Sequence, residues 1–193
     1  MAKFNKDKAI VYNTFQLYRK DRFDFLKQTI ANAKANGFHV GAKLVRGAYM
    51  EKERARAIEK KYPSPIQESK EDSDIDYNLA LEECVKNIDM MGLCAGTHNE
   101  KSSLYLVELM NKYAISSSDK RVYFSQLLGM SDHISYNLAL ANYNVSKYVP
   151  YGPVKEVLPY LMRRAQENTS VKGQTGRELS LIIKEKERRS KLK

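Results

Sequence analysis

Short apolar runs and longer amphipathic stretches alternate along the chain. Residues 9–16 predict a buried strand, and residues 21–36 carry apolar side chains at helical spacing up to Gly37, a residue type that commonly ends helices. The same pattern predicts strands at 38–45, 93–96, 121–127 and 145–149, and helices at 74–91, at 101–113 and from Met130 to about Ala141. A last helix follows Pro153, which suits a first helical turn.

One charged stretch, residues 50–74, interrupts this alternation. It contains Tyr62-Pro63-Ser64-Pro65, which cannot continue a helix. We therefore expect a loop over the whole stretch, and a loop of that length is more often functional than a short connection is.

Strands and helices in this order form a parallel sheet with right-handed crossovers, either an open doubly wound sheet or part of a (β/α)8 barrel. Polar residues directly after the strands favour the barrel, because all strand ends of a barrel meet at one mouth. They are Gln16, Arg46, Thr97, His98, Asn99, Ser125, Gln126 and Tyr148. Five strands do not close an eight-stranded barrel, so either the sheet is open or the chain is part of a larger barrel.

Composition excludes several classes of protein. The 193 residues are 42% hydrophobic, which is enough for a folded core. No apolar run approaches the roughly 20 residues that span a bilayer. Cys84 and Cys94, in a chain without a signal-like amino terminus, favour free thiols in a reducing compartment. We expect the cytoplasm.

Half of the net charge of +10 lies in residues 172–193, where eight Lys or Arg and three Glu give +5. We therefore expect a basic helix or tail over 172–193, after a folded domain over 1–171. Such an end is usually solvated, and attraction to anionic lipid or a protein is the alternative. No zinc spacing or RNA-binding motif supports a metal site or nucleic-acid binding.

The last predicted helix carries an unusual polar stripe. Tyr160, Arg163, Arg164 and Glu167 follow one another at i, i+3, i+4 and i+7, the spacing of a single helix face. A solvated face with one weak ion pair is the simple interpretation, and a clamp for an anionic ligand is the functional one. The pairing of two guanidinium groups with a phenol and a carboxylate favours the clamp.

Five segments together resemble the proline dehydrogenase family, whose members use FAD to oxidise L-proline to pyrroline-5-carboxylate. They are Lys43-Leu-Val-Arg-Gly-Ala-Tyr49, Thr97-His-Asn-Glu100, Leu127-Leu-Gly-Met130, Tyr148-Val-Pro-Tyr-Gly-Pro153 and Tyr160-Leu-Met-Arg-Arg-Ala-Gln-Glu-Asn168. Their order and spacing agree from about Tyr12 to Asn168. The resemblance implies the (β/α)8 fold and its catalytic activity, with a partial catalytic barrel over residues 1–171.

The resemblance also implies substrate-binding residues. Arg163 and Arg164 resemble a pair that grips the proline carboxylate, a role that suits the planar and permanently charged guanidinium. Glu167 resembles the carboxylate that pairs with them. Tyr148 and Tyr160 resemble aromatic residues around bound proline, and Leu127 resembles an apolar wall beneath its ring. Hydride transfer from proline C5 to flavin N5 would follow, with Lys43, Tyr148, Arg163 and Arg164 as catalytic residues.

The flavin contacts implied by the resemblance come from three consecutive strand ends. They are Gln16, Lys43, Val45, Gly47, Ala48, Tyr49, Met50, Thr97, His98 and Asn99. Lys43 would favour the anionic form of the reduced flavin. Some members of the family have Arg in place of Lys43 and Trp in place of Met50.

The resemblance covers only the carboxyl-terminal half of the family's barrel, from its fourth to its eighth strand. The strands before it would supply an acidic residue and a lysine of the active site. We therefore expect the chain to self-associate or to require that other half. The resemblance implies a membrane quinone as electron acceptor and peripheral contact at the inner membrane, on the mitochondrial matrix side in a eukaryote. Two alternatives remain: a hydroxyproline dehydrogenase and a non-catalytic half-barrel.

Overall fold

The computed structural model describes residues 1–47, 49–170, 180, 183–184 and 186–191, with side chains as far as Arg164 in the last long helix. These residues form two compact units, Met1–Lys147 and Tyr148–Lys193. Each unit is described by itself. The expected boundary after residue 171 falls among residues outside the description and stays a prediction.

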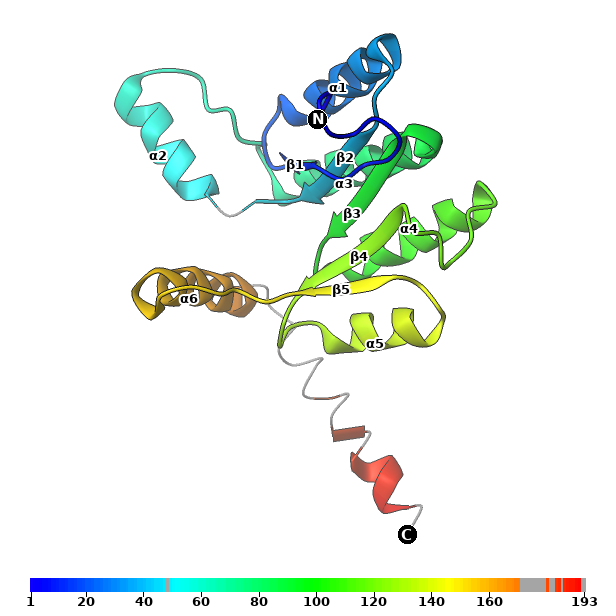
Figure 1. The fold of residues 1–193 in the computed structure, drawn as a ribbon. Coiled ribbons are helices and arrows are strands. Elements are labelled where there is room, and N and C mark those ends of the chain that lie inside the picture. Colours follow the sequence, from blue (N-terminus) through cyan, green and yellow to red (C-terminus); the bar gives the residue numbers. More distant parts are fainter. Residues whose placement is uncertain (48, 171–179, 181–182, 185, 192–193) are drawn as a thin grey trace. The chain divides into compact units, whose positions relative to one another are not determined.

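The chain alternates between strands and helices as expected (Figure 1). The elements are β1 (Tyr12–Gln16), α1 (Arg22–Asn36), β2 (Val40–Val45), α2 (Met50–Lys60), α3 (Lys70–Lys86), the 3-10 turn η1 (Ile88–Met90), β3 (Met91–Gly96), α4 (Glu100–Lys112), β4 (Val122–Leu127), α5 (Asp132–Leu140), β5 (Val145–Tyr148) and α6 (Val154–Ser170). Gly37 ends α1 in the left-handed conformation, with φ of 62°. Pro153 directly precedes α6 and accepts the first hydrogen bonds of that helix.

The expected loop over residues 50–74 is wrong for most of its length. Residues 50–60 form α2, because the Glu, Lys, Arg and Ala of this segment are strong helix formers. Lys61 ends α2 with φ of 55°. The loop is confined to residues 61–69, and Ser69 begins α3 through reciprocal hydrogen bonds with Asp72.

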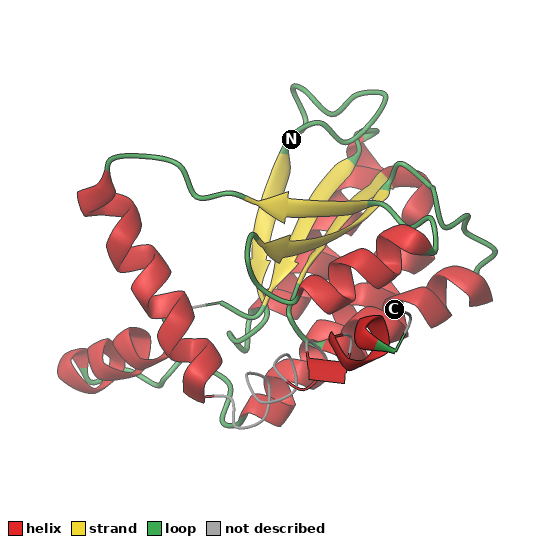
Figure 2. Cartoon of the chain, turned by 90° about the horizontal axis from the view of Figure 1, so that it is seen from below, coloured by secondary structure: helices red, strands yellow, loops and turns green. Residues whose placement is uncertain are grey.

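Strand order settles which kind of parallel sheet is present. The five strands lie in the order β1-β2-β3-β4-β5, and the pairs from β1 to β4 are parallel. A doubly wound sheet reverses its strand order and has helices on both faces. Here α1, α3, α4 and α5 lie on one face of the sheet (Figure 2), and their apolar side chains form one core with those of the strands. The sheet therefore has the organisation of a partial barrel.

The other face of the sheet is called the bare face below because α1, α3, α4 and α5 do not pack on it. It holds Tyr12, Lys43, Cys94, Tyr123 and their neighbours of the same strand phase. Tyr12 is 40% exposed and Tyr123 36%. A Cβ at Gly41 would lie 2.8 Å from Tyr12 Cγ, and one at Gly92 would lie 2.3 Å from Tyr12 Oη. The phenol therefore crosses β2 and β3 over two glycines. A complete barrel turns this face inward.

Asn5 anchors the segment before β1 and should matter strongly for stability. The side chain is fully buried, donates to Val11 O and His39 O, and accepts from the amides of Ile10 and Val11 at 2.8–3.0 Å. Asn5→Ala leaves these backbone groups unpaired. We expect a loss of roughly 3 kcal/mol in the free energy of unfolding, measured by urea denaturation.

Asn36→Ala is the matched control for this substitution. Asn36 is exposed, and its side-chain amide donates to Asn32 in the preceding turn of its own helix. The control should change stability by no more than about 0.5 kcal/mol. Equal effects of the two substitutions would contradict the anchoring role of Asn5.

Candidate functional site

The ends of β1 and β2 bring three of the expected flavin residues together on the bare face. Gln16 pairs with Val45 at the last register position, and Lys43 lies one side chain earlier beside Thr14. The Lys43 stem extends toward β3, where a Cβ at Gly96 would lie 3.6 Å from Lys43 Cε. Because Gly96 has no side chain, this end of the sheet has room for a half-buried cation.

Cys94 lies opposite Lys43 on the neighbouring strand, and the charge of Lys43 affects the pKa of the Cys94 thiol. Burial raises the pKa of the Cys94 thiol, whereas the nearby Lys43 ammonium and a hydrogen bond to Ser125 oppose the rise. Cys94 and Cys84 are both free thiols. The thiol therefore stays neutral at physiological pH, and Lys43 supplies the positive charge at this end of the bare face.

The loop after β2 turns at Gly47, for a reason that the sequence did not reveal. Gly47 has φ of 81°, and a Cβ placed on it would lie 1.7 Å from Tyr18 Cε1. Small size at this position is thus required by the buried Tyr18 ring, whatever else approaches the loop. Of the other expected residues here, Tyr49 is exposed and Met50 begins α2. Ala48 lies outside the described residues.

Tyr18 in turn ties the loop after β1 to α2. Its hydroxyl donates to Glu53 Oε1 at 2.7 Å, and Arg19 Nη1 donates to the other carboxylate oxygen at 2.5 Å. Burial and the neighbouring Glu53 carboxylate raise the pKa of Tyr18 far above its ordinary value. The phenol therefore stays protonated and keeps its role as donor.

The loop after β3 carries Thr97, His98 and Asn99, and it is held at both ends. Asn99 caps α4 by accepting from the Ser102 amide at 3.1 Å, and the Asn99 amide donates to Thr97 Oγ1 at 3.0 Å. His98 Nδ1 lies 2.9 Å from Ser131 Oγ, in the loop before α5. The expected contribution of this segment to a site at the strand ends thus rests on an ordered turn.

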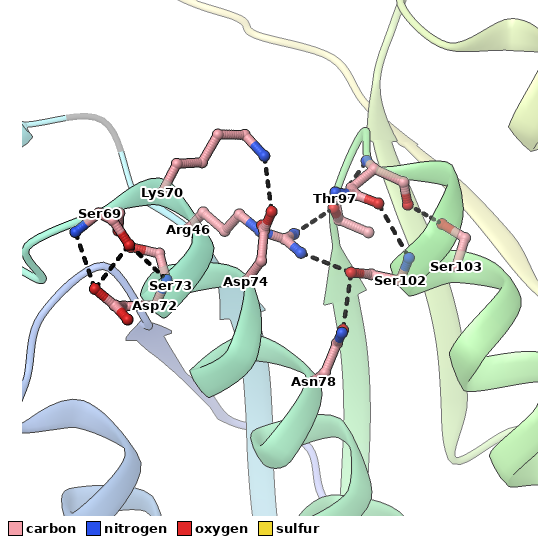
Figure 3. A network of polar contacts seen from close by, with 11 residues as sticks. Arg46, Ser69, Lys70, Asp72, Ser73, Asp74, Asn78, Thr97, Ser102 and Ser103 are labelled. Atoms are coloured by element: carbon pink, nitrogen blue, oxygen red, sulfur yellow. Dashed lines mark hydrogen bonds and ion pairs between the residues drawn. The ribbon is translucent and has the colours of Figure 1, made fainter.

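Arg46 joins the loops after β2 and β3, and Figure 3 shows its guanidinium between α3 and α4. Nε donates to Asp74, Nη1 to Thr97 Oγ1 at 2.7 Å, and Nη2 to Ser102 Oγ at 2.6 Å. Burial of Asp74 acts to raise the pKa of its carboxyl, but Lys70 and Arg46 outweigh burial and lower that pKa. Sequence reasoning missed this network, since only the fold brings Asp74 to Arg46.

The second unit brings together three of the expected substrate residues. Tyr148 and Tyr160 meet edge to face with ring centroids 6.1 Å apart, and Arg164 Cζ lies 5.5 Å from the centre of the Tyr160 ring. An open pocket of about 210 Å³ lies here, lined by Tyr148, Pro150, Tyr151, Gly152, Glu156, Val157 and Tyr160. Aromatic rings beside a guanidinium suit a small ligand that is apolar at one end and anionic at the other.

The remaining expected substrate residues are placed as follows. Arg163 is partly buried on α6 beside Arg164. Glu167 belongs to α6, but its side chain lies outside the description, so its ion pair with the arginines stays a prediction. Leu127 ends β4 in the first unit and is 6% exposed.

Comparison with known proteins identifies the family. The proline dehydrogenase family model matches residues 1–177. The chain is 43% identical to proline dehydrogenase 1, mitochondrial, from Drosophila melanogaster, over 98% of this chain and 29% of the relative. It is 44% identical to the human protein of the same name, over 93% of this chain and 30% of the relative. A hydroxyproline dehydrogenase from Xenopus laevis is 42% identical, over 98% of this chain and 41% of the relative.

A solved structure gives the same answer for the fold. The crystal structure of proline utilization A from Bdellovibrio bacteriovorus, inactivated by N-propargylglycine, superposes with a TM-score of 0.77 at 28% identity, covering 82% of this chain and 16% of that one. The chain thus spans less than a third of the length of its Drosophila and human relatives. With a consecutive parallel sheet covered on one face, it has the architecture of a partial TIM-type barrel. The chain belongs to the proline dehydrogenase family.

Proposed function

We propose that this chain supplies part of the catalytic barrel of an enzyme that oxidises L-proline to pyrroline-5-carboxylate with FAD. The observation that carries the proposal is an open pocket lined by the Tyr148 and Tyr160 rings, with the Arg164 guanidinium beside the Tyr160 ring. Two aromatic faces and a fixed cation complement a pyrrolidine ring that bears a carboxylate. Family membership supports the same reading.

The carboxyl end of the bare face fits a flavin in its chemistry. Lys43 offers a half-buried cation, Gln16 an amide at the adjacent strand end, and Gly96 an absence of side-chain bulk. Thr97, His98 and Asn99 follow on the next loop and would complete the polar contacts. A flat aromatic cofactor that carries phosphates needs this combination of space and positive charge.

The chain's own residues would bind and orient the substrate. Oxidation removes a hydride from C5 and a proton from the ring nitrogen, which creates the C=N bond. The flavin, when bound, accepts that hydride. Arg163 and Arg164 would hold the carboxylate, Tyr148 and Tyr160 would hold the ring, and Leu127 would exclude water beneath it. Fixed geometry of this kind lowers the entropic part of the barrier.

A visible absorption spectrum of the purified chain with FAD, before and after L-proline, tests the proposal. We expect a bound-flavin spectrum that L-proline bleaches under anaerobic conditions, and that D-proline does not. Flavin that binds but never bleaches would reject the oxidase activity of this chain. A chain that takes up no flavin would support the alternative of a non-catalytic half-barrel.

The same assay separates proline from hydroxyproline as substrate. The Xenopus relative is named a hydroxyproline dehydrogenase and is nearly as similar to the chain as the proline dehydrogenases are. Room for a ring hydroxyl beside Tyr148 and Tyr160 would decide the preference. Faster bleaching by trans-4-hydroxy-L-proline than by L-proline would reassign the substrate.

We further propose that the bare face is covered in the working protein, by a second copy or by the other half of the barrel. It exposes Tyr12 and Tyr123, and β1 lies at one edge of the sheet order. Exposed apolar faces and free strand edges favour association. Gel filtration with light scattering should give a mass above that of one 22.2 kDa chain. A compact monodisperse monomer would contradict this expectation.

The cellular setting is proposed from the same sources. Among the described residues, no helix is both long and apolar enough to cross a membrane. The Drosophila and human relatives are named as mitochondrial. We place the protein in the mitochondrial matrix of a eukaryote or the cytoplasm of a bacterium, passing electrons to a quinone at the adjacent membrane. The basic residues 172–193 would attract anionic lipid there.

A further inference from the structure

Arg46 is the first residue of the loop after β2, and its side chain binds Thr97 at the start of the loop after β3. Because successive residues of a strand point to opposite faces and Val45 is on the bare face, Arg46 faces away from it. Its guanidinium reaches α3 and the start of α4 instead, as Figure 3 shows. The side chain is 20% exposed, and Arg46 Cζ lies 4.0 Å from the centre of the fully buried Tyr77 ring. Arg46 is therefore an internal support whose contacts can be assigned atom by atom.

All three guanidinium nitrogens are used, each on a different element or loop. Nε bonds to Asp74 on α3, Nη1 to Thr97 in the loop after β3, and Nη2 to Ser102 in the first turn of α4. A planar fork can make these three bonds at once, whereas a lysine ammonium offers one point charge on a flexible stem. The contact set is specific for arginine.

The partners of Arg46 also define the turn that carries His98. Thr97 Oγ1 accepts from Nη1 and also from the Asn99 amide. Ser102 Oγ accepts from Nη2 and donates to Asn78 Oδ1 at 2.8 Å, while the Ser102 amide donates to the Asn99 cap. Without Arg46, Thr97 and Ser102 lose their common donor. The turn between them would then be free to shift relative to β2.

We propose that Arg46 is a positioning residue, which holds the Thr97-His98-Asn99 turn in register with the loop after β2 so that both can contact one ligand. The inference rests on the proposed flavin site. It assigns no chemical step to Arg46 itself. Its ion pair with Asp74 anchors the guanidinium, and the bonds to Thr97 and Ser102 transmit that position to the turn.

Amide hydrogen exchange of the chain without ligand, followed by NMR, tests the positioning role directly. In Arg46→Lys, which keeps the charge but loses the fork, exchange at Asn99 and Ser102 should rise about tenfold, as expected for the loss of hydrogen bonds to a charged group. Amides of α1 should stay at their original rates. Thr97→Val should reproduce the effect, and Thr97→Ser, which keeps the hydroxyl, should not.

Arg121→Lys is the matched control. Arg121 also uses its fork, on Asp119, but it precedes β4 at the opposite end of the strands. It should leave exchange at Asn99 and Ser102 unchanged. An unchanged rate at these two amides in Arg46→Lys, or a uniform rise that includes α1, overturns the positioning role.

FAD titration then separates this inference from the proposed function. A local rise in exchange together with at least a tenfold weaker FAD affinity in Arg46→Lys supports both. A local rise in a protein whose wild type binds no FAD supports the positioning of the turn and rejects the flavin site. Unaltered FAD affinity despite a local rise overturns the link between the turn and the ligand.

Discussion

Replacement of Arg164 by methionine should lower kcat/KM for L-proline in the FAD-loaded protein by roughly a hundredfold. A guanidinium that forms two charge-assisted hydrogen bonds to a carboxylate contributes about 3 kcal/mol of binding free energy. Because a tenfold change in kcat/KM corresponds to about 1.4 kcal/mol, the loss of these bonds gives roughly a hundredfold decrease. Arg164 lies beside the Tyr160 ring, which lines the proposed pocket, so its positive charge is next to that pocket. Initial rates of flavin reduction across proline concentrations measure the effect.

Two controls separate carboxylate recognition from general damage to α6. Lys155→Met removes an exposed cation from the first turn of the same helix and should leave kcat/KM within about twofold, because an exposed charge of this kind contributes little. L-prolinamide replaces the carboxylate by a neutral amide. Wild type should strongly prefer proline over prolinamide, and Arg164→Met should discriminate only weakly between them. Unchanged discrimination would refute the carboxylate role of Arg164.

Substitution of Gly47 by alanine should produce the largest loss of stability among the glycine variants of the strand-end loops. An L side chain at φ of 81° costs about 1 kcal/mol, and a Cβ within 1.7 Å of Tyr18 forces a displacement that adds about 2 kcal/mol. We expect a total near 3 kcal/mol in the free energy of unfolding, measured by urea denaturation. The loop and the Tyr18–Glu53 hydrogen bond should both be disturbed.

Gly129→Ala isolates the backbone contribution. Gly129 has φ of 77°, close to that of Gly47, but a Cβ there meets nothing within 4 Å. Its substitution should cost only the backbone penalty of about 1 kcal/mol. In a Tyr18→Ala background, Gly47→Ala should cost no more than Gly129→Ala does. Equal costs of the two glycine substitutions in the wild-type background would show that the Tyr18 ring yields without penalty.

Local features of the fold could be predicted from the sequence because their causes are local. The end of α1 at Gly37 depends on one residue that adopts the left-handed conformation, and apolar periodicity located β2, β4 and α4 to within about two residues. The error at residues 50–60 is also local. Pro63 and Pro65 exclude a helix only around themselves, whereas the preceding Glu, Lys, Arg and Ala residues favour one.

The residues of the candidate site also divide into those that could be predicted as a group from the sequence and those whose placement depends on the fold. Tyr148, Tyr160 and Arg164 could be predicted as a group, because helix periodicity places Tyr160 and Arg164 on one face and the family motifs add Tyr148. Lys43 and Gln16 could be predicted only as neighbours at strand ends. Their shared face, and the approach of the Lys43 stem to Gly96, depend on the register between β1, β2 and β3.

The sequence by itself therefore determined the family, the order of the elements and the residue types of the proposed site. Only the tertiary structure decided that α1, α3, α4 and α5 pack on the same face of the sheet, that Tyr18 excludes a side chain at Gly47, and that Arg46 binds Asp74 and Thr97. The physical reason is the range of the interactions. Helix periodicity and caps act within a few residues, whereas strand register, ring packing and a forked ion pair join residues that only folding brings together.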